Sequence, residues 1–220
     1  MSVSFRLMVL ALLVVGIFAS QTAQAQSCPR HKTEMILKPE LTKTKFLRGS
    51  AQRLTEWATG HTQTVGAILG LGGGEIGTRF QAAFEYSVLP NGGVCVILDK
   101  VKATFYAHPR MYIASDYKKG SCEYDEIVKH EKRHVKALID SHSDNTERLR
   151  VHMGRIAKRI PMFGPVSEAD VPYVKQRLMD FVMNEYLSYQ DHQLMALQRA
   201  QKKIDSPSEY RGVAARCDNW

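Results

Sequence analysis

Hydrophobic and polar residues alternate along the middle of the chain. Between residues 80 and 88, FQAAFEYSV, the alternation has the period of two expected of a half-buried β-strand. A second strand-like run, VCVILDKVKATFYAH, covers residues 94–108, and Pro90-Asn91-Gly92-Gly93 lies between the two. Because Asn-Gly between such runs is typical of a tight reversal, the sequence predicts a β-hairpin here.

The region before this hairpin predicts shorter elements. Residues 32–46 are compatible with an extended strand that is interrupted at Pro39. Ser50 is expected to cap a short helix, AQRLTEWA, that ends near Gly60. Residues 62–69 predict another strand.

A glycine-rich segment, GLGGGEIG at residues 70–77, is expected to form a flexible turn. It contains the pattern G-x-G-x-x-G, but a dinucleotide site needs a helix directly after that pattern. From Thr78 onward the chain alternates like a strand instead. We therefore interpret the segment as a turn near the functional cleft.

After Gly120 the pattern changes to the period of an α-helix. Apolar-facing positions recur every three or four residues from Ser121 onward, and acidic residues fall in the first turns, where negative charge is favoured. The polar cluster SHSDN at 141–145 is expected to break this helix before a further helical stretch that ends near Arg159.

A loop is expected around residues 161–165, which contain two prolines and a glycine. Asp170 and Pro172 then open a last long helix that is expected to reach Ile204. Strands come first and helices second, which predicts an α+β fold: a small antiparallel sheet followed by long helices.

The N-terminus has the features of an export signal. An apolar run at residues 7–19, LMVLALLVVGIFA, follows Arg6 and precedes Ala23-Gln24-Ala25. The run is too short for a transmembrane helix, which needs about 20 apolar residues. We predict a signal peptide at 1–25, cleavage after Ala25, and a secreted or periplasmic single domain at 26–220 with no stable membrane insertion.

Four cysteines remain in the mature chain. In an exported protein an even number predicts disulfides, here two with three possible pairings. None of the cysteines has the C-x-x-C spacing of a thiolate metal site. Our expected pairing is Cys28 with Cys95 and Cys122 with Cys217, which would tie the C-terminal tail to the start of the helix at 121.

The formal charge of +8 does not indicate a nucleic-acid partner. The lysines and arginines are scattered among acidic residues, and no compact basic run with aromatic residues is present in the sequence. A solvated surface explains the charge, and anionic polymers outside the cytoplasm are a further possible partner.

The strongest chemical signal is His130-Glu131-Lys132-Arg133-His134, an H-E-x-x-H motif within the helix at 121. Two histidines four residues apart on a helix project from one face, so both imidazoles can bind one zinc ion. Glu131 points about 100° away from His130 and is expected to act as general base on a zinc-activated water. Two histidines on a solvated face are the alternative interpretation.

The arrangement of strands followed by a helix with His130, Glu131 and His134 resembles the zincin metallopeptidases. More narrowly, CEYDEIVKHEKRH and the long strand before it are similar to the DUF922 family, a bacterial group of predicted secreted zinc-dependent proteases. The resemblance covers most of the mature chain, but only H-E-x-x-H within it is specific. It implies a zincin-like fold, a zinc cofactor, and a peptide or protein substrate.

A third metal ligand is needed, and the sequence leaves three candidates. Glu185 is preferred, because gluzincins take a glutamate from a later helix and Met183-Asn184-Glu185-Tyr186 resembles that segment. Glu185 also lies on an apolar-facing stripe, where a carboxylate is costly unless it is paired or bound to metal. The alternatives are His192 and Asp140, and a salt bridge is the competing explanation for Glu185.

An oxyanion-stabilising side chain is also expected, and the sequence does not choose among four candidates. They are Tyr117, Tyr186, Tyr189 and His108. The sequence hypothesis is therefore a secreted zinc metallopeptidase. Its rival is a non-enzymatic, disulfide-stapled cell-envelope protein with a structural metal or none.

Overall fold

The computed structural model describes residues 27–59 and 66–220. The predicted signal peptide and its cleavage site therefore lie outside the described residues, as does the first half of the strand predicted at 62–69. Residues 66–69 are described and do not form a strand, because β3 begins at Gly70. The elements are β1 (Glu34–Leu41), β2 (Lys45–Gly49), α1 (Ala51–Thr59), β3 (Gly70–Val88), β4 (Val94–Ala114), α2 (Cys122–Ala157), β5 (Phe163–Val166), a 3₁₀ turn (Glu168–Asp170), α3 (Val171–Ile204) and α4 (Pro207–Ala214).

One mixed sheet is organised around the long strand β4. On one side β4 pairs with β3 in an antiparallel hairpin that runs almost the full length of both strands. On its other side it pairs with β1 and β2, both parallel to it, and with the short antiparallel strand β5. The α+β class is confirmed, but the prediction of an antiparallel sheet is wrong for β1 and β2. After β2 the chain passes through α1 and then runs back along β3 before it enters β4. Strands β1 and β2 therefore run in the same direction as β4.

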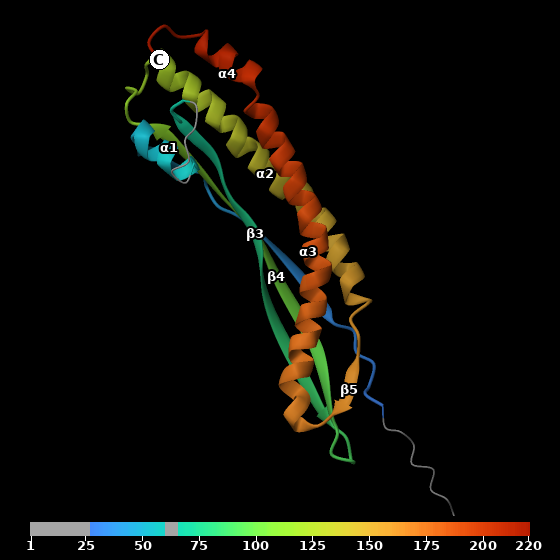
Figure 1. Cartoon of the computed structure of the whole chain (residues 1–220). Helices are drawn as coiled ribbons and strands as arrows, with labels where there is room; N and C mark the ends of the chain where they lie inside the picture. The colour runs from blue at the N-terminus through green and yellow to red at the C-terminus, as the bar shows by residue number, and fades with distance from the viewer. Residues whose placement is uncertain (1–26, 60–65) are drawn as a thin grey trace, which may run out of the picture.

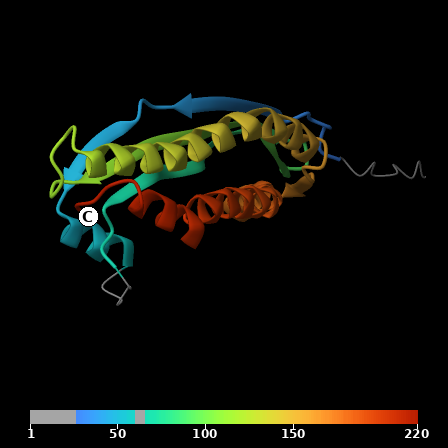
Figure 2. The same ribbon diagram turned by 90° about the horizontal axis from the view of Figure 1, so that it is seen from above.

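Helices α2 and α3 are antiparallel and lie side by side along the sheet (Figures 1 and 2). Apolar side chains of β4, the end of α2 and the first half of α3 form the largest buried cluster. Its members are Val94, Val96, Leu98, Val101, Ile156, Val174, Leu178 and Val182. Because the two long helices run in opposite directions, the start of α2 lies beside the end of α3.

The hairpin between β3 and β4 is confirmed, with Gly92 at a φ of 81° in the turn. The backbone N–H of Leu89 donates to the carbonyl of Gly93 at 2.8 Å, which closes the reversal. A positive φ suits glycine because it has no Cβ to collide with the backbone. Ser50 caps α1 as predicted, since its hydroxyl accepts the N–H of Arg53. Ser121 caps α2 in the same way and accepts the N–H of Tyr124.

The glycine-rich segment at 70–77 is not a turn but the first part of strand β3. Its glycines allow the strand to pass directly under α2. A Cβ on Gly70 would lie 2.5 Å from Oε1 of Glu131, and a Cβ on Gly72 would overlap the main-chain carbonyl of Glu131. The segment therefore contains glycine because of a close approach between a strand and a helix, which sequence periodicity does not reveal.

Gly72→Ala is expected to lower the free energy of unfolding by about 1–3 kcal/mol, because α2 must move to make room for the methyl group. The matched control is Gly154→Ala on α2, where an added Cβ meets no atom within 4 Å. That change is expected to stabilise the helix by about 0.5–1 kcal/mol. Urea unfolding measures both, and equal midpoints for the two variants would contradict the close packing of β3 on α2.

Helix α2 continues without interruption through 141–145, so the predicted break is wrong. Asn145 donates to the carbonyl of Ser141 at 2.7 Å, and Thr146 donates to the carbonyl of His142 at 2.8 Å. The ring of His142 is buried and bonds to the carbonyl of Phe105 on β4 at 3.1 Å. Because these polar side chains are bonded within the helix or to the sheet, they do not end it.

Both expected disulfides are present. The Cα atoms of Cys28 and Cys95 lie 5.5 Å apart, and those of Cys122 and Cys217 lie 5.8 Å apart. The second bridge fastens the tail behind α4 to the first residue of α2. Helix α3 ends at Ile204 as predicted, but α4 after it was not anticipated. Across the described residues, no helix combines the length and the apolar character needed to cross a bilayer.

Candidate metal centre

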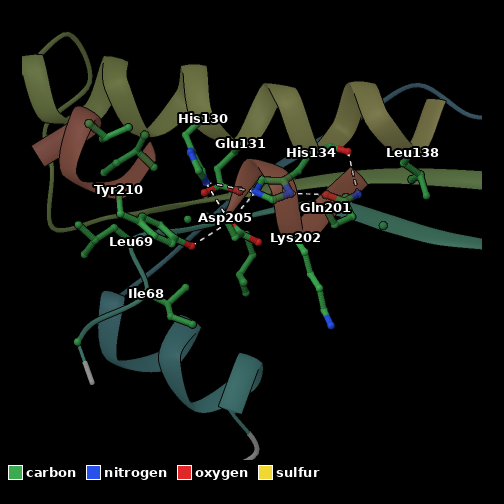
Figure 3. Close-up of a pocket in the computed structure, with 18 of the residues that line it drawn as sticks. Ile68, Leu69, His130, Glu131, His134, Leu138, Gln201, Lys202, Asp205 and Tyr210 are labelled. Atoms are coloured by element: carbon green, nitrogen blue, oxygen red, sulfur yellow. Dashed lines mark hydrogen bonds and ion pairs between the residues drawn. The ribbon is translucent and has the colours of Figure 1, made fainter. Parts of the chain in front are cut away.

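The two histidines of the motif meet at the end of the molecule where α2 begins. Both are buried on α2, and their Nε2 atoms lie 3.2 Å apart. The helix places them there because residues four apart share one face, about one turn apart along the axis. Figure 3 shows both rings pointing away from α2 toward the end of α3.

Asp205 completes the group from the far end of the chain. It is the C-cap residue of α3, and its Oδ1 lies 3.2 Å from Nε2 of His130 and 3.0 Å from Nε2 of His134. The hydroxyl of Tyr210 on α4 donates to the same oxygen at 2.8 Å. Two nitrogens and one carboxylate oxygen therefore converge on one point, as zinc-binding ligands do.

The spacing of the three ligand atoms suits a tetrahedral zinc ion. Zinc binds histidine nitrogen and carboxylate oxygen at about 2.0–2.2 Å, which places neighbouring tetrahedral ligands about 3.3–3.6 Å apart. The three distances here, between 3.0 and 3.2 Å, are slightly shorter. A small outward movement of the ligands would accommodate the ion.

Gln201 selects one tautomer of the neutral His134 ring. Its amide nitrogen donates to the main-chain carbonyl of His134 at 3.2 Å, so its amide oxygen faces Nδ1 of the same ring. The Nδ1–H must then donate to that oxygen, which leaves a lone pair on Nε2. This lone pair faces the carboxylate of Asp205, an arrangement that is repulsive unless a proton or a cation lies between them.

His130 is held differently. Arg133 donates from Nη2 to Nδ1 of His130 at 2.9 Å and from Nη1 to Glu209 at 2.7 Å. Since an arginine only donates, neutral His130 carries its proton on Nε2, between the ring and Asp205. Binding a metal through Nε2 requires that proton to move to Nδ1, so Arg133 would keep only its bond to Glu209. Burial is the main cause that lowers the pKa of His130, although its bond to Asp205 acts in the opposite direction, and the lower pKa favours the neutral ring that a metal needs.

Glu131 is buried between α2 and the glycine-rich part of β3. The N–H of Gly72 donates to its carboxylate, and the absence of side chains on Gly70 and Gly72 provides the space that it occupies. Burial is the main cause that raises the pKa of Glu131 to about 8, and the negative charge of Asp205 adds to it. A carboxyl group with a pKa in this range can both take up and release a proton near neutral pH.

The three ligands and Glu131 line an open cleft of about 1070 Å³ (Figure 3). Its floor is the segment from Gly66 to Gly74, and its walls come from α2, the end of α3, α4 and the C-terminal tail. Strand β3 lines the cleft through Gly70–Gly74, and among residues 27–59 and 66–220 it pairs with β4 alone, so its other edge carries no partner strand. The site is therefore accessible, and it lies next to an open strand edge.

Glu185, the preferred third ligand from the sequence, does not lie at the histidines. Its carboxylate forms two hydrogen bonds with Arg159, at 2.7 and 2.9 Å, so the competing salt-bridge explanation is the correct one. Twenty residues of helix separate Glu185 from Asp205, which is about 30 Å along α3. Only the end of α3 reaches the start of α2.

The two alternative ligands are also elsewhere. Asp140 is exposed and pairs with Lys136, and His192 is exposed on α3. Sequence reasoning missed Asp205 because it follows the apolar stripe of α3. A usable signal was present: a ligand facing the start of α2 must come from the end of an antiparallel partner helix, and Asp205 is the first acidic residue at that end.

None of the four candidates for an oxyanion-stabilising residue contacts the ligands. Tyr117 lies beside Trp220, Tyr186 donates to Thr78, Tyr189 stacks on His152, and His108 pairs with Glu40. The hydroxyl at the site belongs to Tyr210. Burial and its bond to Asp205 raise the pKa of Tyr210, so it remains a hydrogen-bond donor.

Gln201→Leu is expected to weaken zinc binding by about 10- to 100-fold, the usual cost of removing the partner that orients a histidine ligand. Gln201→Glu keeps an acceptor for Nδ1 of His134 and should retain at least the original affinity. Competition with a fluorescent zinc chelator measures both variants. Equal affinities for the Leu and Glu variants would show that Gln201 does not position the ring.

In comparisons with known proteins, no family model, curated protein or solved structure matches the chain.

Proposed function

We propose that this chain is a secreted, zinc-dependent hydrolase that cleaves peptide or amide bonds, with a zincin-like active site. His130, His134 and Asp205 are the proposed metal ligands, and Glu131 is the proposed general base. The resemblance to zincins and to the DUF922 family rests on the H-E-x-x-H motif and agrees with this assignment.

The convergence of the three ligand atoms supports the proposal more than any other observation. Two imidazole nitrogens of α2 and a carboxylate oxygen of Asp205, which lies 75 and 71 residues after His130 and His134, are within 3.2 Å of one another. Two of the three atoms are lone-pair acceptors that face each other at 3.0 Å. Such a pair is favourable when a proton or a metal ion lies between the two atoms, and a zinc ion would bind all three atoms at once.

The open cleft favours a catalytic site over a structural one. Structural zinc sites are closed by four protein ligands, whereas catalytic sites have three and leave a position for water or substrate. Three ligands are available here, and they line a cleft that is open to solvent. The hydroxyl of Tyr210 reaches Asp205 and does not close that position.

The chemistry follows from the groups around the ligands. A bound Zn²⁺ supplies Lewis acidity, which lowers the pKa of a coordinated water and polarises a carbonyl group. Glu131 lies next to the ligands in a water-poor slot and takes the proton from the attacking water. It then returns that proton to the leaving nitrogen, so the carboxyl group ends the cycle as it began.

The open edge of β3 provides a way to hold a polypeptide. An extended segment can add to an exposed strand edge through main-chain hydrogen bonds, without regard to its sequence. The residues of β3 nearest to Glu131 are glycines, so no side chain keeps such a segment away from the cleft. This favours a polypeptide substrate over a small amide.

Metal analysis of protein purified without chelator tests the proposal. We expect one zinc per chain, hydrolysis of a casein or mixed-peptide substrate, loss of that hydrolysis with a chelator, and recovery when zinc is restored. Zinc binding without hydrolysis would indicate that the metal only stabilises the fold. Protein that neither contains nor binds zinc would support the rival, a non-enzymatic envelope protein.

A further inference from the structure

The cleft extends to one side of the metal ligands into a recess with apolar walls. Five side chains form what we call the apolar wall: Ile68, Leu69, Ile127, Val213 and Trp220. They come from the segment before β3, from α2, and from α4 with the tail behind it. Figure 3 shows Ile68 and Leu69 on the same side of the ligands as Tyr210, whereas Lys202 lies on the other side.

The apolar wall carries no charge, although it borders a site that is crowded with polar groups. The nearest hydroxyl, that of Tyr210, is already bonded to Asp205. Apart from the ligands and Glu131, the charged side chain that lines the cleft within the described residues is Lys202. A polar substrate side chain placed against the apolar wall would lose water and gain no hydrogen bond.

The apolar wall is held in position by the fold itself. The N–H of Ile68 donates to the hydroxyl of Thr55 at 2.8 Å, and the carbonyl of Leu69 accepts from Ala114 at 2.8 Å. The opposite part is fastened by the bond between Cys122 and Cys217. Because the recess is already formed, little binding energy is lost to rearrangement of the protein when a substrate binds. Its shape can therefore discriminate between substrate side chains.

We propose that the apolar wall is a specificity site, and that it receives a bulky apolar side chain, such as Leu, Met or Phe, next to the bond that is cleaved. This rests on the proposed hydrolase function, since it assigns the substrate class of the same cleft. Burial of such a side chain against the five residues removes apolar surface from water on both partners. Peptides with Leu at this position are expected to exceed those with Ser by about 10- to 100-fold in kcat/KM.

A matched series of internally quenched peptides tests the inference. The peptides share one sequence and differ only at the varied position, which carries Leu, Phe, Ser, Asp or Lys. Cleavage sites are located by mass spectrometry, and kcat/KM is measured with the zinc-loaded protein. The same peptides are titrated against the Glu131→Gln variant, so that binding is measured without turnover.

Val213→Asp places a charge on the apolar wall and is expected to reduce the Leu-over-Ser ratio by at least about tenfold. The control is Gly212→Asp, which adds the same charge one residue earlier, where an added Cβ meets no atom within 4 Å. It should leave the ratio within about twofold of the original. Val213→Thr keeps the shape of valine and should lower the Leu-over-Ser ratio by about threefold. If Val213→Asp loses zinc, the Val213→Thr variant is measured in its place.

The possible results separate the two proposals. Cleavage of all five peptides with similar kcat/KM would overturn the specificity site and leave the hydrolase intact. If no peptide is cleaved, but Leu and Phe peptides bind at least about tenfold more tightly than Ser peptides, the apolar wall stands as a recognition site and the hydrolase proposal falls. Equal binding of all peptides together with no cleavage would overturn both.

Discussion

Replacement of Glu131 by Gln is expected to reduce kcat for peptide hydrolysis by about 10²- to 10⁴-fold, the usual contribution of a general acid–base group. Glutamine has the same shape and fills the slot above Gly70 and Gly72, so the packing of α2 on β3 should be preserved. It cannot accept a proton from water at neutral pH. Zinc content should therefore remain at one per chain while turnover is lost.

Asp140→Asn is the matched control for this prediction. Asp140 lies on the same helix and undergoes the same change from carboxyl to amide, but it is exposed and pairs with Lys136. We expect its kcat to stay within about twofold of the original. Full hydrolysis by the Glu131→Gln variant, measured with zinc bound, would remove Glu131 from the mechanism.

Asp205→Ala is expected to weaken zinc binding by more than about 100-fold, because removal of a ligand costs more than removal of a ligand's hydrogen-bonding partner. Hydrolysis should be lost with the metal. The same change leaves the two histidines in place, and two ligands from one helix do not complete a zinc site. Zinc affinity is measured by competition with a chelator, and secondary structure by circular dichroism.

The informative control is Glu185→Ala, since the sequence alone favoured this residue as the ligand. In the structure Glu185 is bonded to Arg159, so its loss should leave zinc affinity unchanged. It should lower the free energy of unfolding only by about 0.2–1 kcal/mol, as for other partly exposed ion pairs. A loss of zinc in Glu185→Ala, with zinc retained in Asp205→Ala, would reverse the assignment.

Patterns that depend on neighbouring residues were predictable. The hairpin through Asn91 and Gly92, the start of α2 next to Ser121 and the end of α3 at Ile204 each follow from a few adjacent positions. The spacing of His130 and His134 belongs to the same class, because four residues of helix bring two rings to one face. The pairing of the four cysteines was also correct, although spacing alone left three possibilities.

The errors concern residues whose partners are distant in sequence. The glycines at 70–77 have the composition of a turn, but they form a strand because α2 packs closely against them. The polar residues at 141–145 have the composition of a helix break, but the helix continues because His142 bonds to the sheet. The parallel pairing of β1 and β2 with β4 likewise depends on the route of the chain between them.

The sequence by itself determined the hairpin, the start of α2, the bounds of α3, and the placement of the two histidines and the adjacent carboxylate on one helix. Each of these depends on backbone geometry over a few residues. Only the tertiary structure identified Asp205 as the proposed third ligand. Glu185 and Asp205 are both acidic residues of α3 or its end, and the antiparallel packing of two long helices determines which of them lies beside His130. That packing is set by the summed burial of apolar side chains over the whole length of both helices, so no local pattern around either carboxylate contains it.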